Sequence, residues 1–246
     1  MRLYAGTSSD FVRHAAQNQI ASRLETAFER HYLYQPAPSE VASWRNSLRA
    51  MSQVFQTANL DDHGVMLEYQ LPLTSKRLDC MVMGRDLPGS DHAVIVELKQ
   101  WEKSFETEGD DLIRTYTGRG ERDVLHPSRQ VGQYQEYLEG THTAFHEGEA
   151  PIALASCSYL HNYHFVPDDP LRAVKHAAVL ERFPLYGADD FDTLCHFLSG
   201  RLDGGQGMEV LRRVEAGKYR PSKKLLEHVG NVIKGQGDDE DVHFED

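Results

Sequence analysis

The chain has 246 residues, with 26 Lys or Arg against 38 Asp or Glu and a formal net charge of −12. With 40% hydrophobic and 26% charged residues, its composition excludes a disordered or fibrous protein and favours a globular one. No run approaches the roughly 20 apolar residues that cross a bilayer, and no cationic and apolar leader is present, so we expect a soluble cytoplasmic protein. The acidic balance disfavours a protein coated by nucleic acid on all sides but allows a local basic groove.

The first part of the chain predicts two amphipathic helices followed by three strands. Apolar residues at helical spacing predict one helix over 11–32 and a second that begins at Ser39. The pattern then changes to a period of two, which predicts strands over 65–71 and 77–83 that form a hairpin. The apolar run over 92–100 is typical of a central strand.

The second part alternates between loops, helices and strands. Residues 102–128 are polar and contain three glycines, which predicts a long, mobile loop, and such loops are often functional. The patterns then predict a helix over 127–138, a strand over 151–159 and a helix over 189–202, with an apolar segment over 177–186. The three cysteines are far apart in the sequence, so we expect small buried hydrophobes and no disulfide or metal knuckle.

One short motif carries candidate chemistry, namely Asp79 followed by Glu97-Leu98-Lys99. Side chains two residues apart on a strand point to the same face, so Glu97 and Lys99 should project together. If the strand over 77–83 pairs with the one over 92–100, Asp79 converges on Glu97 at the same edge. Two convergent carboxylates attract a hard cation.

This set of groups suits phosphodiester hydrolysis, which needs a divalent metal, a source of hydroxide near neutral pH and a cation near the attacking water. Asp79 and Glu97 would bind Mg²⁺ or Mn²⁺, and the carbonyl of Leu98 could add a ligand. Lys99 would orient or help deprotonate the water. A surface ion pair on an edge strand remains the simpler interpretation of the Glu-x-Lys tripeptide alone.

The residues resemble the PD-(D/E)XK nuclease superfamily, whose motif is a metal-binding Asp, a gap and Glu-x-Lys at the end of the next strand, as in Asp79, Glu97 and Lys99. Gln130 and Tyr134, at i and i+4 on the following predicted helix, are similar to the Gln-xxx-Tyr element of the RecB-like and Cas4-like branches. The resemblance implies an α/β, restriction-endonuclease-like core with a central mixed β-sheet flanked by helices. It also implies a metal-dependent nuclease acting on nucleic acid, with DNA the expected substrate.

The resemblance extends to the N-terminal nuclease-like region of bacterial proteins that continue into a Schlafen-like superfamily 1 helicase domain. The similar stretches are residues 43–48, 68–73, 77–79, 97–101, 159–163 and 220–223. This implies work with a helicase in anti-phage defence or repair. The chain contains no GxxxxGK[ST] phosphate loop, so the helicase would be another domain or subunit.

On this basis we divide the chain into three parts. Residues 1–203 would form the nuclease-like domain, residues 204–235 a basic helical extension broken by Pro221, and residues 236–246 a disordered acidic tail. Whether the protein forms a homo-oligomer is left open by the sequence.

Further acids and bases are candidates for the site. The superfamily often adds an acid from the first helix, and Glu25, Glu29 and Glu40 could serve, although a solvated helix carboxylate is the plainer interpretation of each. Glu68, a candidate catalytic residue, faces either the metal site or solvent. Arg77 lies two residues before Asp79 on the predicted strand and could contact phosphate or pair with an acid.

Candidate nucleic-acid contacts lie near the motif and in the C-terminal basic segment. They are Arg77, Lys103, Arg129, Arg220, Lys223 and Lys224. Basic and aromatic residues of the 102–129 segment could grip a single strand, but its many acids suit a solvated loop equally well. A structural zinc site is disfavoured, because histidines at ligand-like spacing have no cysteines nearby. The alternative function is a catalytically silent module that binds nucleic acid or regulates a helicase.

Overall fold

The computed structural model describes residues 1–72, 74–118 and 120–233. The helices in chain order are α1 (Ser8–Ala16), α2 (Ile20–Tyr32), α3 (Pro38–Thr57), α4 (Pro127–Thr141), α5 (Ala177–Arg182), α6 (Phe191–Leu202), α7 (Gly207–Ala216) and α8 (Lys223–Ile233). The strands are β1 (Tyr4–Thr7), β2 (Gly64–Gln70), β3 (Arg77–Arg85), β4 (Asp91–Lys99), β5 (Ser104–Phe105), β6 (Leu112–Thr117), β7 (Gly120–Leu125), β8 (Ala153–Leu160) and β9 (Leu185–Tyr186). Within these ranges no helix has both the length and the apolar character needed to cross a membrane.

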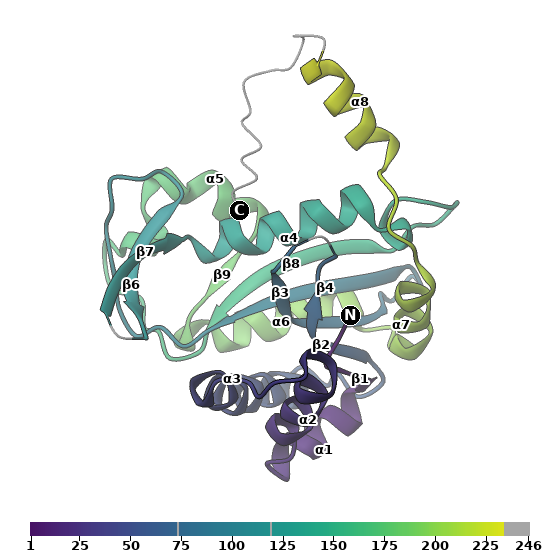
Figure 1. Ribbon diagram of the computed structural model, residues 1–246, viewed down its shortest axis with the longest axis horizontal. Coiled ribbons are helices and arrows are strands. Elements are labelled where there is room, and N and C mark those ends of the chain that lie inside the picture. The colour runs from purple at the N-terminus through teal and green to yellow at the C-terminus, as the bar shows by residue number, and fades with distance from the viewer. Residues whose placement is uncertain (73, 119, 234–246) are drawn as a thin grey trace.

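The central sheet has six strands in the order β1-β2-β3-β4-β8-β9. The first four pair antiparallel, and β8 pairs parallel with both β4 and β9. A parallel pair needs a long crossover connection, and the one between β4 and β8 contains α4. The protein is therefore an α/β fold with a mixed sheet, and the predicted hairpin of β2 and β3 is present (Figure 1).

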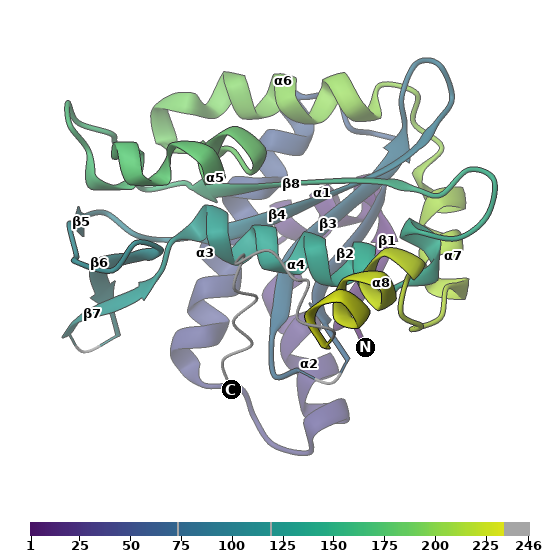
Figure 2. The same cartoon turned by 90° about the horizontal axis from the view of Figure 1, so that it is seen from above.

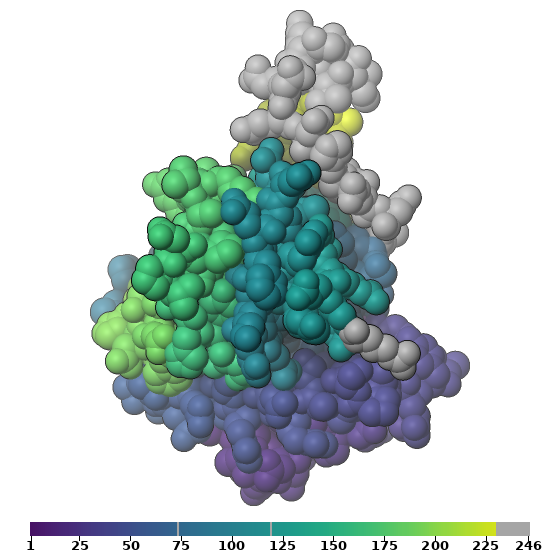
Figure 3. Space-filling view, turned by 90° about the vertical axis from the view of Figure 1, so that its left-hand side faces the viewer, coloured from purple at the N-terminus to yellow at the C-terminus, as the bar shows by residue number. Residues whose placement is uncertain are grey.

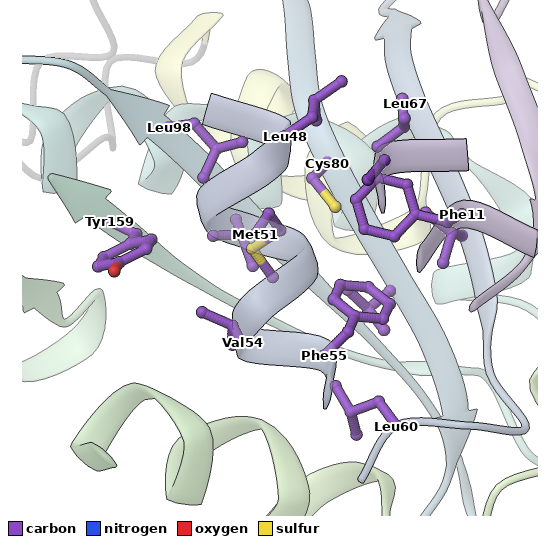
Figure 4. Close-up of a cluster of buried hydrophobic side chains, with 14 of the residues drawn as sticks. Phe11, Leu48, Met51, Val54, Phe55, Leu60, Leu67, Cys80, Leu98 and Tyr159 are labelled. Carbon is purple, nitrogen blue, oxygen red and sulfur yellow. The ribbon is translucent and has the colours of Figure 1, made fainter. Parts of the chain in front are cut away.

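Helices cover both faces of this sheet, and each face has its own core. Helices α1, α2, α3 and α6 bury alternate residues of β2, β3 and β4 on one face. Helices α4 and α7 cover the opposite face, where the other residues of the same strands are buried (Figures 1 and 2). Figure 4 shows Leu48, Met51 and Phe55 of α3 in the first core, with Phe55 next to Phe11 of α1. The three cysteines are buried thiols, as expected.

The single helix predicted over 11–32 is in fact two helices. Asn18 has a positive φ of 55° between α1 and α2, a conformation that helix-forming residues rarely adopt. Thr7 caps α1 by accepting a hydrogen bond from the Asp10 backbone at 3.0 Å, so the helix begins at Ser8, three residues earlier than expected. The four-residue strand β1 was not predicted.

The long loop predicted over 102–128 is wrong, because this segment contains the three-stranded sheet β5-β6-β7. Ile113 and Thr115 are buried while Arg114 and Tyr116 are exposed, which is the alternation of a half-buried strand. Ile113 packs with Leu160 at the end of β8, with Leu185 of β9, and with Tyr163 and Leu171 from the connection between them. Figure 2 shows this sheet extending from one end of the molecule, and Figure 3 shows it beside the green α5 segment.

The C-terminal segment contains two helices separated at Pro221, as predicted. Helix α7 buries Val210, Leu211 and Val214 in the second core, so it is an integral part of the fold. Helix α8 projects from the body in Figure 1 and exposes Leu226. The tail predicted over 236–246 lies outside the described residues.

Candidate active site

The structure brings Asp79, Glu97 and Lys99 together at one edge of the central sheet. The pairing of β3 with β4 ends at Cys80 and Val96, and Asp79 and Glu97 are the next residues on their strands. Asp79 Oδ2 accepts the backbone N–H of Leu98 at 2.7 Å, and Lys99 Nζ donates to Glu97 Oε1 at 2.7 Å. The convergence expected from strand alternation is therefore present.

A break in strand regularity lies beside this site. Glu68 on β2 has a positive φ of 50°, which is rare for a residue with a long side chain. The residues before and after Glu68 in the chain belong to different cores, and so do those before and after Asp79. The paired residues Leu67 and Cys80 lie in the first core, and the paired residues Tyr69 and Leu78 lie in the second. In a regular strand, residues i and i+2 would share a face. The alternation thus reverses at Glu68 and Asp79, which lie opposite each other.

Helix α4 supplies the polar groups that face Glu97. Gln130 Nε2 donates to Glu97 Oε1 at 2.9 Å and to the hydroxyl of Tyr134 at 2.8 Å. Tyr134 is buried, and burial raises the pKa of its hydroxyl. One helical face therefore presents an amide to the carboxylate and a phenol that orients the amide.

The carboxylate of Glu97 is only partly satisfied. The residue is 2% exposed, and its Oε1 accepts the bonds from Lys99 and Gln130. Its Oε2 is buried and has no hydrogen-bond partner among the described residues. An unpaired buried carboxylate oxygen is costly, and each such atom calls for an explanation. A cation bound between Glu97 and Asp79 would provide the missing partner, so the residues fit Mg²⁺ or Mn²⁺.

The carbonyl of Leu98 is on the correct side of β4 to contribute. The N–H and C=O of one residue in an extended strand point to the same neighbouring strand. Because the Leu98 N–H points to Asp79, its carbonyl faces that side too. No cluster of three or more His, Cys, Asp or Glu side chains with metal-binding geometry exists within the described ranges. The candidate ligands are therefore two carboxylates and one carbonyl.

The electrostatics of the site favour a cation. Burial, followed by the charges of Glu97 and Glu68, raises the pKa of Asp79 well above its usual range. Burial lowers the pKa of Lys99, but the carboxylates of Glu97 and Asp79 outweigh it and raise that pKa above its ordinary value. Lys99 therefore stays protonated near neutral pH. Its single positive charge faces the carboxyl groups of Asp79 and Glu97 together, so a further cation would reduce the repulsion between these two groups.

Arg77 lies between two acids. Of the two roles expected for it, contact with phosphate or pairing with an acid, the structure shows the pairing with acids. Its Nε is 3.3 Å from Glu68 Oε2, and its Nη2 pairs with Glu40 Oε1. Glu68 is 6% exposed, and its burial raises its pKa to about 7 although Arg77 lowers it. Of the three helix acids considered, Glu40 reaches this cluster.

The remaining candidate nucleic-acid contacts differ in their surroundings. Arg129 pairs with Asp111 at 3.0 Å between Nε and Oδ1, and Arg220 pairs with Glu147 at 2.6 Å. Three lysines are exposed, one beyond β4 and two in the first turn of α8, namely Lys103, Lys223 and Lys224. Surface ion pairs of this kind are weak, so pairing does not prevent Arg129 or Arg220 from contacting phosphate.

A polar network that the sequence analysis missed anchors the end of β4. Gln100 Nε2 donates to Ser43 Oγ at 2.8 Å and to Ser47 Oγ at 3.1 Å, and Ser47 Oγ is 3.2 Å from His161 Nε2. This network joins β4, α3 and the residue after β8. The available signal was the i, i+4 spacing of Ser43 and Ser47 on α3, which places both hydroxyls on one side of the helix.

Comparison with family models, curated proteins and solved structures finds no match for this chain.

Proposed function

We propose that the chain is a Mg²⁺- or Mn²⁺-dependent nuclease that hydrolyses phosphodiester bonds, with DNA as the substrate. The observation that carries this proposal is the buried, unpartnered Oε2 of Glu97 beside Asp79, with Lys99 bound to the other oxygen of the same carboxylate. The mixed sheet flanked by helices, with these residues at the edge of β3 and β4, supports a restriction-endonuclease-like core.

Asp79, Glu97 and the Leu98 carbonyl would hold the cation. A bound Mg²⁺ or Mn²⁺ would neutralise charge that develops on the phosphate and lower the pKa of a coordinated water. Lys99 stays protonated because the carboxylates raise its pKa, which favours orientation of the attacking water and charge stabilisation over proton abstraction. Gln130 and Tyr134 keep Glu97 in position from α4.

The resemblance to nuclease–helicase proteins supports a role with a helicase domain or subunit in anti-phage defence or repair. The second candidate function is a catalytically silent module that binds nucleic acid or regulates a helicase. One observation favours it, namely that the described residues hold no cluster of three metal-ligating side chains.

The decisive experiment is a cleavage assay on circular plasmid, linear duplex, single-stranded DNA and RNA, with Mg²⁺, Mn²⁺ or EDTA. Lys99→Ala is assayed alongside Lys218→Ala, an exposed lysine between α7 and α8. We expect metal-dependent cleavage that Lys99→Ala abolishes and Lys218→Ala retains. Equal cleavage by both variants would contradict the assignment of Lys99 to the active site of a nuclease. Binding without cleavage of any substrate would favour the silent module.

A further inference from the structure

A surface groove of about 600 Å³ lies between the first strand of the central sheet and helix α2. Strand β1 is at the edge of the sheet and contacts both α1 and α2, and these N-terminal elements are the purple ones in Figure 1. β1 lines one side of the groove, the exposed side of α2 lines the other, and α1 contributes Asp10 and His14. None of the residues that line the groove belongs to the candidate active site.

The outer edge of β1 has backbone groups that β2 does not use. Ser8, directly after β1, donates its N–H to the carbonyl of His63, directly before β2, at 2.8 Å. Along an antiparallel strand, successive residues point their backbone groups alternately to the two sides. Gly6 therefore faces β2, and the N–H and C=O of Ala5 face outward. No other segment within the described ranges pairs with this side of β1, so a further strand could bond to it.

Tyr4 and His14 form the uncharged part of the lining. The hydroxyl of Tyr4 is 3.2 Å from Nδ1 of His14, and the two rings meet edge to face. Burial, followed by the charges of Arg23 and Arg13, lowers the pKa of His14 below its usual value, so its ring is neutral near pH 7. The charge of the groove at neutral pH therefore comes from its arginine and aspartate side chains.

Two arginines on α2 make the groove positive. Arg23 and Arg30 are exposed and line it, and their spacing of seven residues places them on the same helical face, about 10 Å apart along the axis. Neither forms an ion pair within the described ranges. The one carboxylate of the lining, that of Asp10, pairs with Arg13. Two guanidinium groups are thus available to an anionic ligand.

We propose that this groove binds an extended acidic segment of another protein, which adds to β1 as a further strand. A polypeptide backbone offers both a donor and an acceptor to Ala5, whereas the phosphate oxygens of a nucleic acid only accept. Side chains two residues apart on an added strand lie on one face, roughly 7 Å apart. Carboxylates at such positions would meet the flexible side chains of Arg23 and Arg30. Because the whole chain has a net charge of −12 and repels acidic peptides in general, binding would depend on this local charge.

The test is a fluorescence anisotropy titration of the full chain with a labelled short peptide of alternating Glu and Val. Arg23→Gln/Arg30→Gln removes the two groove charges, and the control Arg45→Gln/Arg212→Gln removes two exposed arginines of α3 and α7 that also form no ion pair within the described ranges. Both variants change the net charge equally. We expect affinity to fall about tenfold in the groove variant and by less than about twofold in the control.

Two analogues of the peptide separate strand pairing from attraction between charges. In an added strand the N–H groups of the Glu residues face one side and those of the Val residues face the other. Of two analogues, one N-methylated at every Glu and one at every Val, a single one should therefore lose binding. Equal affinities of the two analogues would overturn the proposal, as would equal binding by the two arginine variants or no binding at about 1 mM peptide.

A third readout needs no substitution in the protein. Exchange of the Ala5 amide with solvent, followed by NMR, should slow when the peptide binds, while the Gly6 amide, which faces β2, should keep its exchange rate. Peptide binding that leaves exchange at Ala5 unchanged would overturn the proposal. A single-stranded DNA oligonucleotide is the competitor, and displacement of the peptide by equimolar DNA would make the groove a nucleic-acid site instead.

Discussion

Gln130 and Glu97, 33 residues apart in the chain, are joined by a hydrogen bond of 2.9 Å from the Gln130 amide to Glu97 Oε1. This bond connects the helix that crosses the sheet to the strand that carries the candidate motif. Because Oε1 is occupied by Gln130 and Lys99, the other oxygen of the carboxylate is the one that a cation would bind.

Replacement of Gln130 by Ala should lower cleavage about 10- to 100-fold, because partners of a metal ligand tune its position and basicity. Tyr134→Phe should have a smaller effect, since its hydroxyl contacts Gln130 and acts on Glu97 only through that amide. Steady-state cleavage rates at several metal concentrations measure both. Gln133→Ala is the control, as Gln133 is on the same helix and accepts a bond from exposed Lys76. Wild-type activity in Gln130→Ala would contradict the role given to α4.

Replacement of Asp79 by Asn should stabilise the metal-free protein while removing its response to metal. Burial and neighbouring carboxylates raise the pKa of Asp79, so the wild-type free energy of unfolding falls as the pH rises above about 3.9 and through the raised pKa. Asn carries no charge and can still accept the Leu98 N–H. Thermal melts at pH 8 should show a rise of about 3 °C for the variant.

The same melts with Mg²⁺ test the cation site. A ligand that binds only the folded state raises stability with its concentration, so wild type should gain stability and Asp79→Asn should not. Glu181→Gln should respond as wild type does. An equal Mg²⁺ response in Asp79→Asn would place the cation elsewhere.

Replacement of Arg77 by Met should destabilise the protein more at pH 8 than at pH 5. The folded-state pKa of Glu68 is about 7. Between about pH 4.3 and pH 7, Glu68 therefore ionises in the unfolded chain but stays protonated in the folded chain, so the free energy of unfolding falls as the pH rises through this range. Loss of Arg77 raises that pKa further and extends the loss to higher pH. Urea unfolding should show that the free energy of unfolding of Arg77→Met lies further below that of wild type at pH 8 than at pH 5, by at least about 1 kcal/mol.

Two further variants identify the cause of that difference. The double variant with Glu68→Gln should lose the added pH dependence, and Arg30→Met on the exposed face of α2 should not show it. If the double variant keeps the full difference between pH 5 and pH 8, the destabilisation comes from lost packing of Arg77 on Phe28.

Acidification should destabilise the protein through His126. Burial lowers the pKa of His126 to about 4, against a hydrogen bond to Leu171 that raises it. The unfolded chain therefore binds a proton between pH 6.5 and about 4 that the folded chain does not, and the free energy of unfolding falls by about 2 kcal/mol from pH 7 to pH 5. His126→Asn, which can still cap α4, should lack this contribution in urea unfolding, whereas exposed His31→Asn should retain it.

Local patterns determined the parts of the fold and site that depend on neighbours along the chain. The i, i+2 spacing of Glu97 and Lys99 predicted their shared position, and the i, i+4 spacing of Gln130 and Tyr134 predicted one face of α4. Apolar periodicity likewise predicted most helices and the strands of the hairpin. These features follow from the geometry of a single strand or helix.

Tertiary structure alone decided the rest. The change of face of the side chains at Glu68 and Asp79 depends on the pairing of β2 with β3 around the irregular backbone of Glu68. The pattern of apolar residues within either strand does not predict it. The sheet within 102–128 was hidden because its exposed face is rich in charge, while its few buried residues pack on a distant segment. The contact of His63, just before β2, with the carbonyl of Leu202 at the end of α6 joins residues 139 positions apart. Contacts between such distant segments depend on how whole elements pack, since burial and pairing are set by the fold and not by the residues beside them in the chain.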